Sequence, residues 1–98
     1  MMGSGTLSID VRTLRVLLPL WMRSAGFVVD DSRMADTNMM AVDCEVPTFG
    51  HREAEGYLTS MLRGLTVVDG GVWHRYDDRQ KALFIKVAYG EEEDSDVR

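Results

Sequence analysis

The feature that most constrains this chain of 98 residues is a change in hydrophobic spacing that occurs twice along it. Each time, apolar residues recur at intervals of three and four, as they do along one face of a helix, until a glycine intervenes. The glycines are Gly26 and Gly64, and each is followed by the alternation that is typical of strands. The sequence therefore predicts a helix followed by two strands, and then the same order again.

The first helix is expected over residues 11–25, with Ser8 or Asp10 as its N-terminal cap. Six residues at helical spacing form its predicted apolar stripe: Leu14, Leu17, Leu18, Trp21, Met22 and Ala25. The opposite side is expected to face solvent and carries Arg12, Arg15, Pro19 and Arg23. Pro19 lacks a backbone donor and is expected to bend the helix. A competing interpretation makes residues 6–11 a short strand.

The first hairpin is expected to follow. Residues 27–29 begin its first strand, and residues 35–38 form a polar turn. The second strand alternates, and four of its residues are expected to face inward: Met40, Val42, Cys44 and Val46. Pro47 is expected to end this strand.

The second half has the same organisation. A helix of about 14 residues is expected to begin at Thr48 or Gly50, with an apolar stripe of Ala54, Tyr57, Leu58, Met61 and Leu62. The next strand is expected over residues 65–76, with a bulge or sharp bend at Gly70 and Gly71. After a turn at residues 77–80, the last strand is expected to place Leu83, Ile85, Val87 and Tyr89 inward.

The two halves also share sequence. Residues 22–31 and 61–70 align without a gap and match at four of ten positions, including a Val-Val-Asp run. Because a helix on an isolated hairpin is marginally stable, we expect the two αββ units to join. The predicted fold class is α+β, a four-stranded antiparallel sheet with two helices on one face, or a ferredoxin-like variant of it. Residues 1–90 are expected to form a single domain, and residues 91–98 a disordered acidic tail.

Composition excludes several classes of protein. A single cysteine permits neither an intramolecular disulfide nor a four-cysteine zinc site. The chain contains no apolar run long enough to span a membrane and no signal-peptide pattern, so we expect a cytoplasmic protein.

Candidate catalytic and metal-binding residues are few. Cys44 lies on the inward side of its strand, which is typical of a buried, unreactive cysteine. His51 and His74 are 23 residues apart and lack the close spacing of paired metal ligands. The Asp pairs at residues 30–31 and 77–78 are typical of turns. The sequence therefore predicts a protein that is not an enzyme and that has no cofactor or metal.

Nucleic acid is not expected to be a direct partner. The formal net charge is −5, whereas binding to phosphates depends on cationic side chains. Residues 81–89 alternate apolar and aromatic side chains, but their spacing differs from that of RNA-recognition sheets.

Two features remain as candidate partner-binding surfaces. One is an acidic hairpin, with a net charge of −4 over residues 27–50, whose acids are Asp30, Asp31, Asp36, Asp43 and Glu45. The other is the outer sheet face, where Trp73 and Phe84 alternate away from the predicted core together with Met39, Ala41 and Ala88. The alternative is that this alternation is out of phase and that these residues are core.

These features lead to two functional expectations. The first is a small acidic protein that binds a protein partner stoichiometrically. In its most specific form it is an anti-CRISPR-like inhibitor, from a phage or mobile element, of a nucleic-acid-binding defence or restriction complex. The second is a self-associating α+β subunit, a homodimer with a regulatory or ligand-binding role.

Overall fold

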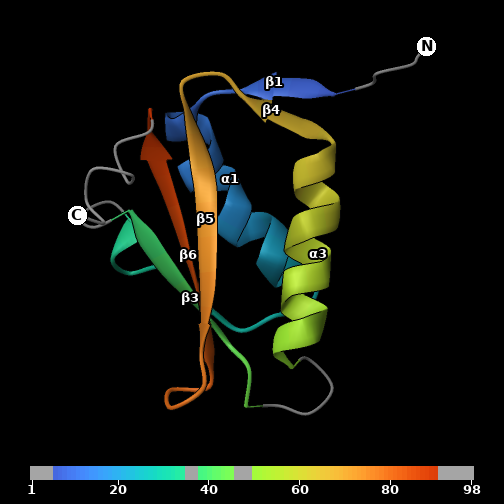
Figure 1. The fold of residues 1–98 in the computed structure, drawn as a ribbon, viewed down its shortest axis with the longest axis vertical. Helices are drawn as coiled ribbons and strands as arrows, with labels where there is room; N and C mark the ends of the chain where they lie inside the picture. The colour runs from blue at the N-terminus through green and yellow to red at the C-terminus, as the bar shows by residue number, and fades with distance from the viewer. Residues whose placement is uncertain (1–5, 35–37, 46–49, 91–98) are drawn as a thin grey trace.

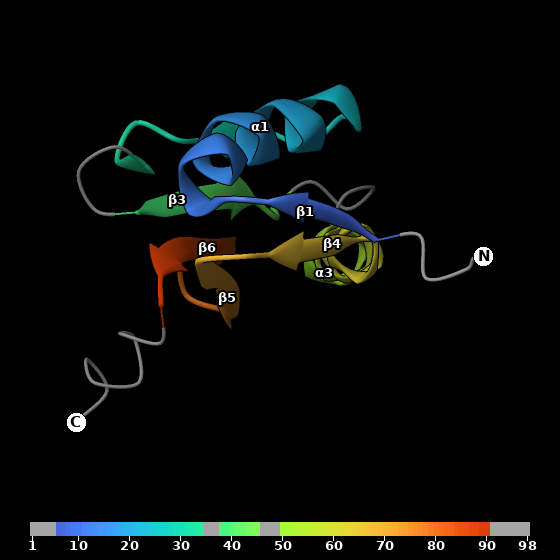
Figure 2. The same cartoon turned by 90° about the horizontal axis from the view of Figure 1, so that it is seen from above.

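Two helices lie against one face of a four-stranded antiparallel sheet in the computed structural model, which describes residues 6–34, 38–45 and 50–90 (Figures 1 and 2). In chain order the elements are β1 (Leu7–Ile9), α1 (Val11–Ser24), β2 (Val29–Asp30), β3 (Met39–Asp43), α3 (His51–Arg63), β4 (Leu65–Val67), β5 (Gly70–Asp77) and β6 (Ala82–Tyr89). The predicted α+β fold class, with both helices on one face of the sheet, is confirmed.

The sheet has the strand order β2-β3-β6-β5, so the second strand of each hairpin lies at its centre. The inward residues of the two central strands are almost completely buried, as predicted: Met40, Val42, Leu83, Ile85 and Val87. Tyr89 was also expected to face inward, but it is 48% exposed. It is the last residue of β6, where the Arg15 guanidinium lies over its ring at 5.1 Å from the ring centre.

Residues 6–11 and the first helix are not alternatives, because both elements form. β1 pairs in parallel with β4 as a separate two-stranded sheet. The prediction that residues 65–69 begin a strand of the main sheet is therefore wrong. The chain turns at Val68 and Asp69, and the main sheet resumes with β5.

The predicted bulge at Gly70 and Gly71 is also wrong, because both residues pair with β6 in unbroken register. Gly70 is needed for close packing instead. A Cβ atom there would overlap the carbonyl oxygen of Ala88 and the side chain of Val11. The sharp bend lies just before it, where the Asp69 carboxylate accepts the Val11 N–H at 2.8 Å. The turn thus holds the first residue of α1 against the end of the sheet.

The N-terminal cap of α1 agrees with one of the two predictions, since the Asp10 carboxylate accepts the Thr13 N–H at 3.0 Å. The predicted solvent side of this helix is only partly correct, because Arg12 and Arg23 are exposed but Arg15 and Pro19 are not. Pro19 is buried in the core side, and Arg15 donates from Nε to the Val87 carbonyl oxygen at 2.9 Å. The helix also carries apolar residues outside its predicted stripe, so its sequence did not define the exact limits of the buried face. The packed face is rotated toward Pro19, which leaves Val16 and Leu20 exposed.

The second helix begins at His51, after Gly50, and buries Ala54 and Leu58. The matched Val-Val-Asp runs occupy different settings, because one lies largely in edge strand β2 and the other spans the end of β4 and the turn after it. The helix-and-hairpin order therefore occurs twice, but these two matched segments are not structural equivalents.

No described helix is long and apolar enough to cross a membrane. Outside the described residues lie Asp36, Val46, Pro47, Thr48, most of the predicted turn at 35–38, and the tail 91–98.

Candidate interaction surface on the open sheet face

The face of the sheet turned away from the helices is built from alternate residues of four strands. Strand register places these residues in rows across the sheet. The acidic row is Asp43, Ala82 and Asp77. The central row is Asp30, Ala41, Phe84 and Arg75. The tryptophan row is Met39, Lys86 and Trp73.

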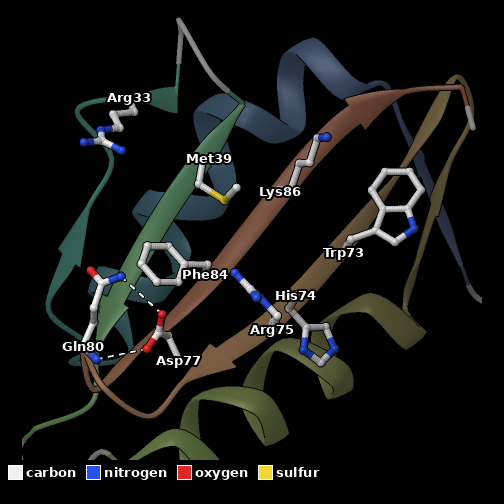
Figure 3. Close-up of a pocket in the computed structure, with 9 residues that line it drawn as sticks. All are labelled: Arg33, Met39, Trp73, His74, Arg75, Asp77, Gln80, Phe84 and Lys86. Carbon is white, nitrogen blue, oxygen red and sulfur yellow. Dashed lines mark hydrogen bonds between the residues drawn. The ribbon is translucent and has the colours of Figure 1, made fainter. Parts of the chain in front are cut away.

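An open depression of about 430 Å³ lies over the central and tryptophan rows (Figure 3). Figure 3 views this face with α1 behind the sheet. The depression is lined by Arg33, Met39, Trp73, His74, Arg75, Asp77, Gln80, Phe84 and Lys86. We call it the tryptophan depression.

The predicted outward orientation of Trp73 and Phe84 is confirmed, and the alternative that they belong to the core is wrong. Both side chains are partly exposed, while Ile85 between the outward positions of β6 is fully buried. The Trp73 indole lies against Gly71, since a Cβ atom at that glycine would be 2.9 Å from the indole Cη2. A glycine at this position therefore allows the ring to lie flat on the sheet.

Cationic side chains surround the aromatic ones. Arg75 is exposed and lies directly across from Phe84 in the register, and Lys86 lies across from Trp73. Among the residues that the structure describes, no carboxylate is within ion-pair distance of Arg75. Tryptophan and arginine are enriched among the residues that contribute most to binding at protein interfaces. Phenylalanine is enriched in the composition of interfaces.

The acidic row borders this depression. Backbone N–H groups of Gln80 and Arg79 donate to the Asp77 carboxylate at 3.1 and 2.9 Å. The Gln80 contact is the largest cause that lowers the pKa of Asp77, and the charge of Arg75 contributes less. Asp77 is therefore held ionised beside the tryptophan depression.

A second depression of about 370 Å³ lies on the same face, toward the edge formed by β2. Asp30, Asp43 and Glu45 line it together with Lys81, so we call it the acidic depression. The Ser32 N–H donates to the Asp30 carboxylate at 3.0 Å and lowers its pKa.

The structure thus brings together much of what the sequence presented as two separate surfaces. Three of the five predicted acids share the open face with Trp73 and Phe84. Asp31 does not, because it is paired with Arg23 of α1 at 3.0 Å. Asp36 lies outside the described residues.

The other candidate residues serve the packing of the fold. Cys44 is buried, its Sγ donates to the Val42 carbonyl oxygen at 3.4 Å, and burial raises the pKa of its thiol. His51 stacks on Tyr76 at 4.0 Å between ring centres. His74 Nδ1 lies 3.7 Å from a Glu55 carboxylate oxygen on α3. Within the described part of the chain, no three potential metal ligands gather.

Sequence reasoning missed the cations of the tryptophan depression. Trp73, Arg75 and Asp77 are spaced by two residues, as are Phe84 and Lys86. That spacing is the signal for a shared sheet face, and it would have identified Arg75 and Lys86 together with the aromatic residues. Sequence reasoning also missed an exposed apolar patch on α1, where Val16 and Leu20 border a depression with Met34.

Comparison with protein-family models, with curated proteins and with solved structures found no match to this chain.

Proposed function

We propose that this chain is a non-enzymatic binding protein that contacts a protein partner stoichiometrically through the open face of its sheet. The observation that carries the proposal is the tryptophan depression, where Trp73 and Phe84 are partly exposed beside Arg75. Tryptophan and arginine are enriched among the residues that contribute most to binding, and phenylalanine is enriched in interfaces. The two aromatic rings bury a large apolar area, while the indole N–H and the guanidinium offer directed hydrogen bonds.

The charge pattern favours a protein over a nucleic acid. A nucleic acid presents phosphates along its whole length, so it requires a surface that is cationic throughout. The open face instead places the acidic row and the acidic depression beside Arg75 and Lys86. A protein surface can present both signs of charge at the matching distances.

The same pattern narrows the chemistry of the partner. Its contact surface would carry an apolar group for Trp73 and Phe84, a carboxylate for Arg75, and a cation for the acidic depression. The more specific expectation, a phage inhibitor of a basic nucleic-acid groove, stays a prediction. Such a groove would match the carboxylates of Asp30, Asp43 and Glu45 and would be repelled by Arg75.

The test begins with capture of a partner from the lysate of the source cell, followed by calorimetric titration of the purified pair. We expect a 1:1 complex that weakens by about 30-fold on Trp73→Ala, as for an interface hot spot. The matched control is Leu20→Ala, which removes an exposed apolar side chain from α1 on another surface.

The control variant should bind as tightly as the wild-type chain. Unchanged affinity in both Trp73→Ala and Phe84→Ala, with circular dichroism showing an intact fold, would exclude the open face as the contact. A separate titration with single-stranded RNA and DNA, followed by tryptophan fluorescence, checks the other class of partner. Saturable binding that Trp73→Ala abolishes would contradict the proposal of a protein partner.

A further inference from the structure

We infer that, in the absence of another partner, a second copy of this chain covers the open face, so that two sheets pack face to face as a symmetric dimer. This goes beyond the proposed function, because it concerns the free chain. The inference rests on the order of the charged residues along the central row of the open face.

The central row carries opposite charges at its two ends. Asp30 lies on edge strand β2 and Arg75 on the opposite edge strand β5, with Ala41 and Phe84 between them. Both charged residues are exposed, and neither forms an ion pair within the described residues. The carboxylate of Asp30 is held ionised by the Ser32 N–H, which lowers its pKa.

This order is self-complementary under two-fold symmetry. Sheets that pack face to face keep their strands within about 30° of each other. A two-fold axis between the sheets and parallel to the strands would place β2 of one copy over β5 of the other. Asp30 of each copy would then face Arg75 of the second copy, so opposite charges would meet twice. A symmetric dimer requires such a pattern, because both copies use the same patch.

The side-chain sizes in the central row are complementary under the same axis. It places β3 of one copy over β6 of the other, so the small Ala41 would face the large Phe84 at two related positions. Large side chains opposite small ones allow two surfaces to pack closely.

The acidic row opposes this association. Asp43 and Asp77 of the two copies would come together at one end of the interface, and like charges there repel. We therefore expect Asp43→Asn to tighten the dimer. Asparagine keeps an oxygen that can accept the Glu45 N–H, which donates to Asp43 at 2.9 Å, so the turn should be preserved.

The test is sedimentation equilibrium of the full chain from low micromolar to near-millimolar concentration. We expect a monomer–dimer equilibrium that weakens by at least about tenfold in Arg75→Asp and in Asp30→Arg, because each variant then faces its own like charges. An equimolar mixture of these two variants should form a heterodimer with wild-type affinity, since opposite charges meet again. Arg52→Glu on the exposed side of α3 is the control and should dimerise normally.

Three outcomes would overturn the inference. They are a strictly monomeric wild-type chain, a mixture of the two charge variants that stays monomeric while both remain folded, and weaker association of Asp43→Asn. None of them affects partner binding, which the Trp73→Ala titration measures separately. If both proposals hold, excess partner should dissociate the dimer into 1:1 complexes, because both occupants use the same face.

Discussion

Successive side chains of β6 point to opposite faces of the sheet, and the two faces differ because the helices cover only one of them. Leu83, Ile85 and Val87 are fully buried beneath the helices. Phe84 and Lys86, which lie between them, are partly exposed and line the tryptophan depression. One strand thus carries both core residues and candidate contact residues, each set at a spacing of two. Substitutions one residue apart should therefore separate stability from binding.

The largest expected effect comes from truncating each face of β6 in turn. Ile85→Ala removes a fully buried side chain and should lower the free energy of unfolding by about 3–4 kcal/mol. Phe84→Ala removes a partly exposed one and should lower it by about 1 kcal/mol or less. Urea unfolding followed by circular dichroism measures both. Equal losses in the two variants would mean that the outward face is also part of the core.

Two adjacent glycines at the start of β5 also lie on opposite faces of the sheet, so substitutions there should differ in their effect on stability. Gly70→Ala forces a methyl group onto the Ala88 carbonyl and the Val11 side chain, and should cost about 2–3 kcal/mol of stability. Gly71→Ala meets the indole of Trp73, whose ring can move, and should cost less than about 1 kcal/mol.

Fluorescence distinguishes the two glycine variants in a Trp21→Phe background, where Trp73 is the one tryptophan left. Emission from Trp73 should change in folded Gly71→Ala, because the ring is displaced from the sheet. If the emission of that variant equals that of its parent, the indole does not rest on Gly71. The control is thermal unfolding of the Trp21→Phe parent, to show that the background itself is stable.

The smallest expected effect concerns the charge of the outward acidic row. The pKa of Asp77 is lowered from 3.8, first by the Gln80 N–H and then by the Arg79 N–H. A carboxylate with a lowered pKa stabilises the fold above its ordinary pKa, and this contribution is lost as the pH falls through the lowered value. Asp77→Asn should therefore lose less stability than the wild-type chain between neutral pH and about pH 3.

Chemical denaturation at a series of pH values measures this difference. Asp78→Asn is the matched control, because Asp78 is exposed in the same turn and its carboxylate contacts Lys81 at 3.9 Å. A wild-type profile that coincides with that of Asp77→Asn would mean that the turn does not depend on the charge of Asp77.

The order of elements could be predicted because it depends on local spacing. The stripe with Leu14, Leu18 and Met22 is buried, and so are Ala54 and Leu58 of the second helix. Gly26 follows the first helix with a φ of 102°, a backbone conformation that favours glycine. In these segments each residue's neighbours in sequence are also its neighbours in the element, so the pattern suffices.

The predictions were wrong where contacts with segments distant in the sequence determine how an element packs or pairs. Pro19 is buried because the rotation of α1 is set by the sheet it packs on, and an exposed Leu20 was as apolar as any buried leucine. Residues 65–76 read as one strand, but the first part pairs with β1 and the rest with β6. The hydrophobic spacing within a strand does not indicate which distant strand it pairs with.

By itself, the sequence determined the two helices, their glycine ends and the inward side of the central strands. It also placed Trp73 and Phe84 on one side of their strands, and the structure showed that this side faces outward. These follow from the periods of helix and strand, which are properties of the local backbone. The tertiary structure alone decided that Asp30, Asp43 and Glu45 share a face with Trp73, Phe84 and Arg75. The strand order β2-β3-β6-β5 brings two hairpins together, and strand order depends on long-range burial of apolar surface rather than on local spacing.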